Sequence, residues 1–168
     1  MAIFTDRIIR AATLEVRLYQ RVKADKKAMG QAAAAVLLSS AAAGLGTITR
    51  AGFGGVVTGT IMALIRWCLW AFLTYQIGTK LLPEARTKAD IGEFARTVGF
   101  SAAPGLIRVL GIVPPAAEMV FLVADMWMLV AMVIAVKQAL DYVWTERAVG
   151  VCVPGWIVNM LIGFWFYA

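Results

Sequence analysis

The chain has 168 residues, of which 61% are hydrophobic and 15% are charged, and its mean hydropathy is +0.79. A soluble domain is about 45–50% apolar and about 25% charged. The composition therefore excludes an ordinary globular domain and predicts an integral membrane protein. The net charge of +6 is interpreted as basic segments on the cytoplasmic side of a membrane rather than as nucleic-acid binding.

The sequence also narrows the chemistry, because it contains no histidine and only two cysteines, Cys68 and Cys152. Histidine is the commonest metal ligand and the usual general base near neutral pH. The two cysteines lie far apart in apolar runs and lack the spacing of a zinc or redox motif. We therefore expect no catalytic residue, no metal site and no cofactor.

Residues 1–27 are basic and have the periodicity of an amphipathic helix. Four arginines share one face of this helix, namely Arg7, Arg10, Arg17 and Arg21. Apolar residues gather opposite them, interrupted by Glu15. The pattern predicts a helix lying on the membrane surface with its arginines toward anionic headgroups. A helix covered by solvent or by protein is an equally good interpretation.

Five apolar segments follow, each long enough to cross a membrane at about 1.5 Å per residue. They span about residues 28–49, 56–78, 94–113, 116–136 and 148–168. The expected fold class is all-α: a polytopic bundle of five transmembrane helices with an amphipathic N-terminal helix at the interface. The chain then divides into a cytoplasmic helix at 1–27 and a transmembrane domain at 28–168.

The segments that connect the expected spans contain residues that predict turns, loops and helix ends. Arg50 and the glycines of 52–55 predict a tight outer turn, and the polar stretch 80–96 predicts an inner loop. Asp90 followed by Glu93 resembles a capping box at the start of a helix. Pro104 is expected to kink the third span, because proline lacks the backbone N–H that a helix needs.

Basic residues outside the spans set the expected orientation. Thirteen of them lie in segments that share one side of the membrane, whereas the other side holds Arg50 and Arg108. The positive-inside rule then places the N-terminus in the cytoplasm and the C-terminus outside. The expected location is a bacterial cytoplasmic membrane.

Charges within the spans are costly in lipid and are the first candidates for a functional site. Arg66 and Asp125 lie at similar depths, roughly 15 Å from the outer ends of their helices at the α-helical rise, so we expect them to pair. Arg108 and Glu118 flank the 114–115 turn and are expected to form a second pair. Such pairs can fix helix contacts, line a proton or substrate pathway, or meet another subunit.

Two further patterns concern helix packing and ligand contact. Gly55 and Gly59 have the small-xxx-small spacing of a helix-packing surface. Trp67, Trp70 and Trp127 lie near the level of the intramembrane charges, where they could contact a lipid, a quinone or a pigment. Core packing is the more common role of such rings.

The order of these features resembles bacterial members of the Yip1 family. The resemblance rests on Leu18–Tyr19 in the basic segment, on VGFSAAPGLIRVLGIVP over 98–114, and on MWMLV over 126–130. It covers nearly the whole chain and implies a helical membrane protein. Eukaryotic members associate with small GTPases and carry a longer cytosolic N-terminal region than the 27 residues found here. No catalytic residue carries over from the family.

These observations favour a non-catalytic accessory or assembly subunit of a larger energy-converting membrane complex, photosynthetic or respiratory. Its expected partners are membrane lipids and other integral membrane subunits, with no nucleic acid and no small-molecule substrate. Two alternatives remain open: a stand-alone Yip1-like protein that organises membranes or recruits a soluble partner, and a small transporter that uses Arg66 and Asp125.

Overall fold

The computed structural model describes residues 2–84, 87 and 90–167, and these residues form helices and turns with no strand. The elements in chain order are α1 (Ala2–Ala12), α2 (Val16–Ala24), the 3₁₀ turn η1 (Lys26–Ala28), α3 (Met29–Leu45), α4 (Ile48–Gln76), the π-helical turn η2 (Ile77–Leu81), α5 (Ile91–Gly99), the 3₁₀ helix η3 (Phe100–Ile112), the 3₁₀ turn η4 (Pro114–Ala116), α6 (Ala117–Ala139) and α7 (Thr145–Tyr167).

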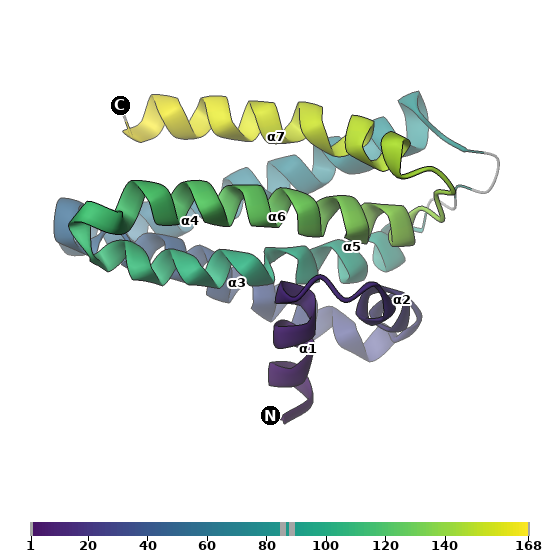
Figure 1. Cartoon of the computed structure of the whole chain (residues 1–168), viewed down its shortest axis with the longest axis horizontal. Helices are drawn as coiled ribbons and strands as arrows, with labels where there is room; N and C mark the ends of the chain where they lie inside the picture. Colours follow the sequence, from purple (N-terminus) through teal and green to yellow (C-terminus); the bar gives the residue numbers. More distant parts are fainter. Residues whose placement is uncertain (1, 85–86, 88–89, 168) are drawn as a thin grey trace.

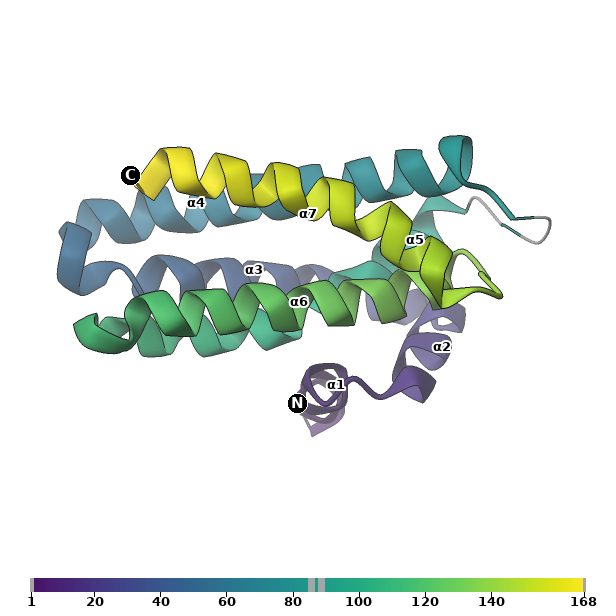
Figure 2. The ribbon, with the colours of Figure 1, turned by 45° about the horizontal axis from the view of Figure 1, so that its top comes forward.

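From α3 onward the chain runs back and forth along one axis, so that successive helices are antiparallel (Figure 1). Figure 2 shows two layers, with α4 and α7 in one and α3 and α6 in the other. The helix η3 packs between α3 and α6, while α4 packs on α3 and α7. We call the end that holds α2 and the 140–144 turn the α2 end, and the opposite end, with the 46–47 and 113–116 turns, the far end.

Among the described residues, three helices are long and apolar enough to cross a membrane, as is consistent with a membrane protein. They are Lys26–Leu45, Ile48–Leu81 and Pro114–Ala139. The other two expected spans, 94–113 and 148–168, fall on α5 with η3 and on α7; Ala168 lies outside the described residues. That these two helices cross the membrane stays a prediction.

The first turn lies earlier than the sequence suggested. It consists of Gly46 and Thr47, and α4 already begins at Ile48, so Arg50 and the glycines of 52–55 lie inside a helix. The Thr47 hydroxyl and the Thr47 backbone N–H both donate to the Gly44 carbonyl, at 2.7 and 3.0 Å, and close the end of α3. Gly52 produces a kink within α4 instead of a turn, because its φ of +61° interrupts the helical backbone.

The third long helical segment, α5 with η3, changes from an α-helix to a 3₁₀ helix along its length. Asp90 caps α5, its carboxylate accepting a hydrogen bond from the Glu93 backbone N–H at 2.7 Å. The backbone becomes 3₁₀ at Phe100, four residues before Pro104. An α-helical proline would clash with the carbonyl four residues earlier and could not donate to it. The narrower 3₁₀ helix that results fits between α3 and α6.

The N-terminal segment is two helices and not one, so the single helix expected over 1–27 is wrong. Leu14 has a left-handed φ of 62° and separates α1 from α2. Leu18, Tyr19 and Val22 of α2 are buried, and α2 packs against α5 and α6. In contrast, α1 packs on η3 and projects from the flank of the bundle, across its long axis (Figure 1).

The arginines of this segment divide into two groups. Arg7 donates to the Asp25 carboxylate at 2.7 Å and to the Gln31 amide oxygen at 2.9 Å, which ties α1 to the start of α3. Arg10 pairs with Asp6 at 2.9 Å. Arg17 and Arg21 lie exposed on α2. Two of the four arginines of the predicted basic face therefore form ion pairs within the chain.

Polar contacts to backbone carbonyls fasten the α2 end. Arg96 is buried and donates to the Lys23 carbonyl at 2.7 Å, and the Lys23 ammonium pairs with Asp141 at 2.7 Å. The Tyr142 hydroxyl oxygen lies 2.7 and 2.9 Å from the carbonyl oxygens of Gly78 and Leu82, which share its single O–H as donor. These contacts join α2, α5, η2 and the turn between α6 and α7.

Candidate functional site

The central feature of the far half of the bundle is an ion pair between Arg108 of η3 and Asp125 of α6. Their side chains are 12% and 20% exposed, so both charges are largely withdrawn from the surroundings. The Arg108 guanidinium also lies 5.9 Å from the centre of the Phe121 ring, within cation–π range. Phe121 precedes Asp125 by one helical turn, so one face of α6 receives the whole arginine side chain.

Both ion pairs expected from the sequence are wrong in their partners. Asp125 pairs with Arg108 and not with Arg66, and Glu118 lies 3.7 Å from Arg50 at the surface and not beside Arg108. Similar depth was a necessary condition for pairing, but it does not fix the direction in which a side chain leaves its helix. Because η3 and α6 form consecutive antiparallel helices around the 113–116 turn, Arg108 is the cation nearest to Asp125.

Arg66 of α4 reaches toward α7 instead. Its Nε donates to the Asn159 side-chain oxygen at 2.8 Å. Gly163, one turn further along α7, makes room for the guanidinium, because a Cβ there would lie 2.7–2.9 Å from its atoms. Asn159 was missed in the sequence, although a lone amide within an apolar helix is a recognisable sign of an interhelical hydrogen bond.

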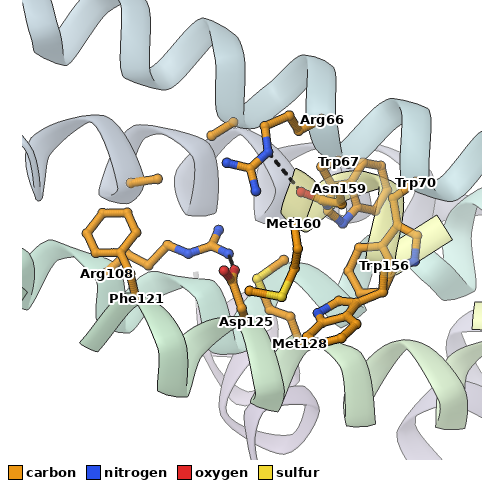
Figure 3. A pocket seen from close by; sticks show the side chains of 12 residues that line it. Arg66, Trp67, Trp70, Arg108, Phe121, Asp125, Met128, Trp156, Asn159 and Met160 are labelled. Atoms are coloured by element: carbon orange, nitrogen blue, oxygen red, sulfur yellow. Dashed lines mark hydrogen bonds and ion pairs between the residues drawn. The ribbon is translucent and has the colours of Figure 1, made fainter. Parts of the chain in front are cut away.

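These side chains surround a cavity of about 40 Å³ between the two layers. In Figure 3, Arg66 enters from α4, and Arg108 and Asp125 meet across the cavity from it. The lining residues are Ala43, Ala63, Arg66, Trp67, Trp70, Arg108, Phe121, Asp125, Met128, Trp156, Asn159 and Met160. Arg66 and Asp125 thus line one space without forming the expected pair.

Hydrogen-bond donors outnumber acceptors around this cavity. The indole N–H groups of Trp67 and Trp156 and the Nε of Arg108 are buried, and none has a hydrogen-bond partner in the described part of the chain. Trp70 also lines the cavity, but its N–H donates to the Cys152 carbonyl at 3.1 Å. Trp127, the third tryptophan singled out in the sequence, lies elsewhere and donates to the Ala12 carbonyl at 2.8 Å.

A second, larger hollow of about 700 Å³ opens at the far end. It is lined by Gly46, Thr47, Arg50, Ala51, Gly55, Thr58, Gly59, Ala117, Glu118, Phe121, Leu122, Asp125 and Met160. We call it the far-end groove. Phe121, Asp125 and Met160 belong to the walls of both the groove and the smaller cavity. The two spaces therefore adjoin.

Gly55 and Gly59, the proposed packing glycines, lie on this side of α4. A Cβ on Gly59 would lie 3.3 Å from the Gly44 Cα, so α3 and α4 approach closely at this pair. Gly55 faces Thr47, whose hydroxyl lies 3.4 Å from its carbonyl oxygen. Both glycines leave the groove wall free of side-chain bulk.

No group of three or more metal-binding side chains occurs among the described residues. Comparison with known proteins gives no further guide: no protein-family model, no curated protein and no solved structure matches the chain. The resemblance to the Yip1 family therefore stays a prediction, and the function must be argued from the site and the surface.

Proposed function

We propose that the chain is a non-catalytic accessory or assembly subunit that packs within a larger membrane complex. In this proposal α3, α4, α5 with η3, α6 and α7 all cross a bacterial cytoplasmic membrane, with the α2 end on the cytoplasmic side and the C-terminus outside. The basic residues near the α2 end support this orientation, among them Lys23, Lys80, Arg96, Lys137 and Arg147.

The observation that carries the proposal is the level at which α1 meets the bundle. Trp127 lies near the middle of α6: its distances to Ala117 and to Ala139 are about 15 Å and about 18 Å at the helical rise. A spanning α6 would hold Trp127 near the centre of a hydrocarbon core about 30 Å thick. Because the Trp127 indole donates to the Ala12 carbonyl at 2.8 Å, the end of α1 lies at the same level.

Lipid is a poor environment for α1 at that level. Asp6 and Arg10 form an ion pair that is exposed on this helix, and charged side chains within the hydrocarbon are costly unless protein or water surrounds them. Ile3 and Ile9 are exposed beside the pair. A mixed apolar and charged face on the flank of a bundle suits a second membrane protein that covers it and pairs with its charges.

The first test is native electrophoresis of the source membrane in mild detergent, with mass spectrometry tracking the chain. We expect it to migrate with a larger complex, and the co-migrating proteins would show whether that complex is photosynthetic or respiratory. Migration near its own mass of 18.2 kDa would overturn the proposal. The Yip1-like and transporter alternatives would then be separated by lipid-binding and flux assays.

A matched pair of variants locates the contact. Ile3→Gln changes the flank of α1, and Ile91→Gln makes the same change at the start of α5; the two residues are 67% and 68% exposed. We expect Ile3→Gln to release the chain from the complex and Ile91→Gln to leave it bound. Equal retention of both variants would show that the α1 flank does not carry the contact.

A further inference from the structure

We propose that the small cavity and the far-end groove together bind a long-chain fatty acid, with the carboxylate in the cavity and the alkyl chain in the groove. The inference is independent of the subunit role, because it concerns the interior of the bundle and not the flank of α1. It begins with the unpartnered donors. Burying a donor without a partner is costly, so three such donors around one space favour an occupant that accepts hydrogen bonds.

The arrangement of the donors suits a carboxylate. The indole N–H groups of Trp67 and Trp156 and the Nε of Arg108 come from α4, α7 and η3, so they surround the space from different helices (Figure 3). Among the described residues that line the cavity, Asp125 supplies a carboxylate, and it already accepts from Arg108. The occupant must therefore bring its own acceptor oxygens, and a carboxylate brings two of them in one compact group.

The volume of the cavity favours a carboxylate over larger groups that accept hydrogen bonds. A water molecule needs about 10–15 Å³ of such cavity volume, so a cavity of about 40 Å³ accommodates roughly three non-hydrogen atoms. A carboxylate has three. A quinone ring or a phosphodiester with its substituents is considerably larger and would require the helices to separate.

The groove supplies the place for the alkyl chain. Its volume of about 700 Å³ lies in the range of small-molecule binding sites, about 300–1,000 Å³. Most of its wall is glycine, alanine and larger apolar side chains, and it adjoins the cavity at Phe121, Asp125 and Met160. A chain lying in the groove would thus join a carboxylate in the cavity without crossing a helix.

The test measures binding of radiolabelled palmitate to the full chain in nanodiscs of neutral lipid. Competition with unlabelled hexadecanol tests the headgroup, octanoate tests the groove, and phosphatidylglycerol tests for a phosphate headgroup. We expect palmitate to bind, octanoate to compete weakly, and hexadecanol and phosphatidylglycerol not to compete. Effective competition by hexadecanol or by phosphatidylglycerol would overturn the proposal, as would an absence of palmitate binding.

Two tryptophan variants test the cavity. Trp156→Phe and Trp67→Phe each keep an aromatic ring and remove the N–H, and we expect each to weaken palmitate binding tenfold or more, as for a lost hydrogen bond to a charged group. Trp165→Phe on the same helix as Trp156 is the control, since Trp165 is 87% exposed. Unchanged affinity in both cavity variants would overturn the proposal.

A stability measurement separates binding from folding. In the ligand-free protein, removing an unpartnered donor should leave the unfolding midpoint unchanged or raise it. With palmitate present, the wild-type midpoint should rise by more than that of Trp156→Phe, because ligand binding stabilises the folded state. If Trp156→Phe lowered the ligand-free midpoint and left the palmitate-induced rise intact, the N–H would have a structural role and the proposal would be wrong.

Discussion

The contacts that hold the two ends of the bundle together differ in burial: they are largely buried at the α2 end and exposed at the far end. At the α2 end, side chains of Arg96 and Tyr142 donate to backbone carbonyls of neighbouring elements at 2.7–2.9 Å. At the far end, Arg50 donates to the Pro114 carbonyl at 3.1 Å and lies 3.7 Å from Glu118, both at the surface, and a groove of about 700 Å³ opens there. The contrast suggests that the α2 end fixes the arrangement of the helices while the far end leaves space for an occupant.

Between these ends the buried pair of Arg108 and Asp125 is where a single change has the largest expected effect. Asp125→Leu leaves a buried guanidinium without its carboxylate, and the expected loss of stability is about 3–5 kcal/mol. The double variant Arg108→Met/Asp125→Leu should recover most of it, because it removes both charges. Chemical unfolding in detergent measures both.

A double-mutant cycle distinguishes Arg108 from Arg66 as the partner of Asp125. Arg66→Met combined with Asp125→Leu should give nearly additive losses, because Arg66 donates to Asn159 and is not paired with Asp125 in the described structure. If Asp125 were coupled more strongly to Arg66 than to Arg108, Asp125 would pair with Arg66, as expected from the sequence.

The close approach of α3 and α4 near the far end gives the next largest effect. A Cβ on Gly44 would lie 2.1 Å from the Thr60 hydroxyl and 2.4 Å from the Val56 carbonyl oxygen. Gly44→Ala should therefore destabilise the protein by about 1–3 kcal/mol through overpacking. Gly54→Ala in α4 is the control, because nothing lies within 4 Å of its added Cβ. Equal unfolding midpoints for the two variants would contradict this packing.

Tyr142→Phe tests the α2 end and should cost about 0.5–1.5 kcal/mol, because it removes the single O–H that the Gly78 and Leu82 carbonyls share. Hydrogen exchange of the 77–82 backbone should accelerate, while exchange around Gly44 should not change. Thr79→Val provides a comparison, because its hydroxyl bonds within its own helical segment, to the Tyr75 carbonyl. Protection of 77–82 that matched the wild type would show that Tyr142 does not fasten this end.

The same tyrosine predicts a pH dependence. Burial, followed by the nearby Glu84 charge, raises the pKa of Tyr142 from 10.0 to about 12. Its stabilising contribution is then complete below pH 10 and is lost as the pH rises toward about 12. The fall in unfolding midpoint between pH 10 and about 12 should be smaller in Tyr142→Phe than in the wild type.

The smallest expected effect concerns the contact of Arg7 with Asp25, which ties α1 to the start of α3. The hydrogen bond from Arg7, followed by that from the Lys27 backbone, lowers the pKa of Asp25 below 3.8. The Arg7–Asp25 contact is therefore present above pH 3.8 and is lost as the pH falls through the lowered value. Asp25→Asn should increase proteolysis within 12–16 in the detergent-solubilised protein at neutral pH, and Asp6→Asn is the control.

The sequence predicted the helical fold and the three strongest apolar helices because these follow from length and composition along one chain. It also predicted the start of α5, since capping by Asp90 is a contact between residues three apart. The change of backbone at Phe100 could be anticipated from Pro104 for the same reason. Each of these features depends on neighbours in sequence.

The tertiary structure decided which charges meet and where the donors point. Depth along a helix can be counted from the sequence, but the direction of Arg66 toward Asn159 and of Arg108 toward Asp125 depends on how the helices are rotated about their axes. The break at Leu14 likewise follows from the packing of α1 and α2 on different neighbours. The composition determined that the helices are apolar; their rotation and packing determined the cavity and its unpartnered donors.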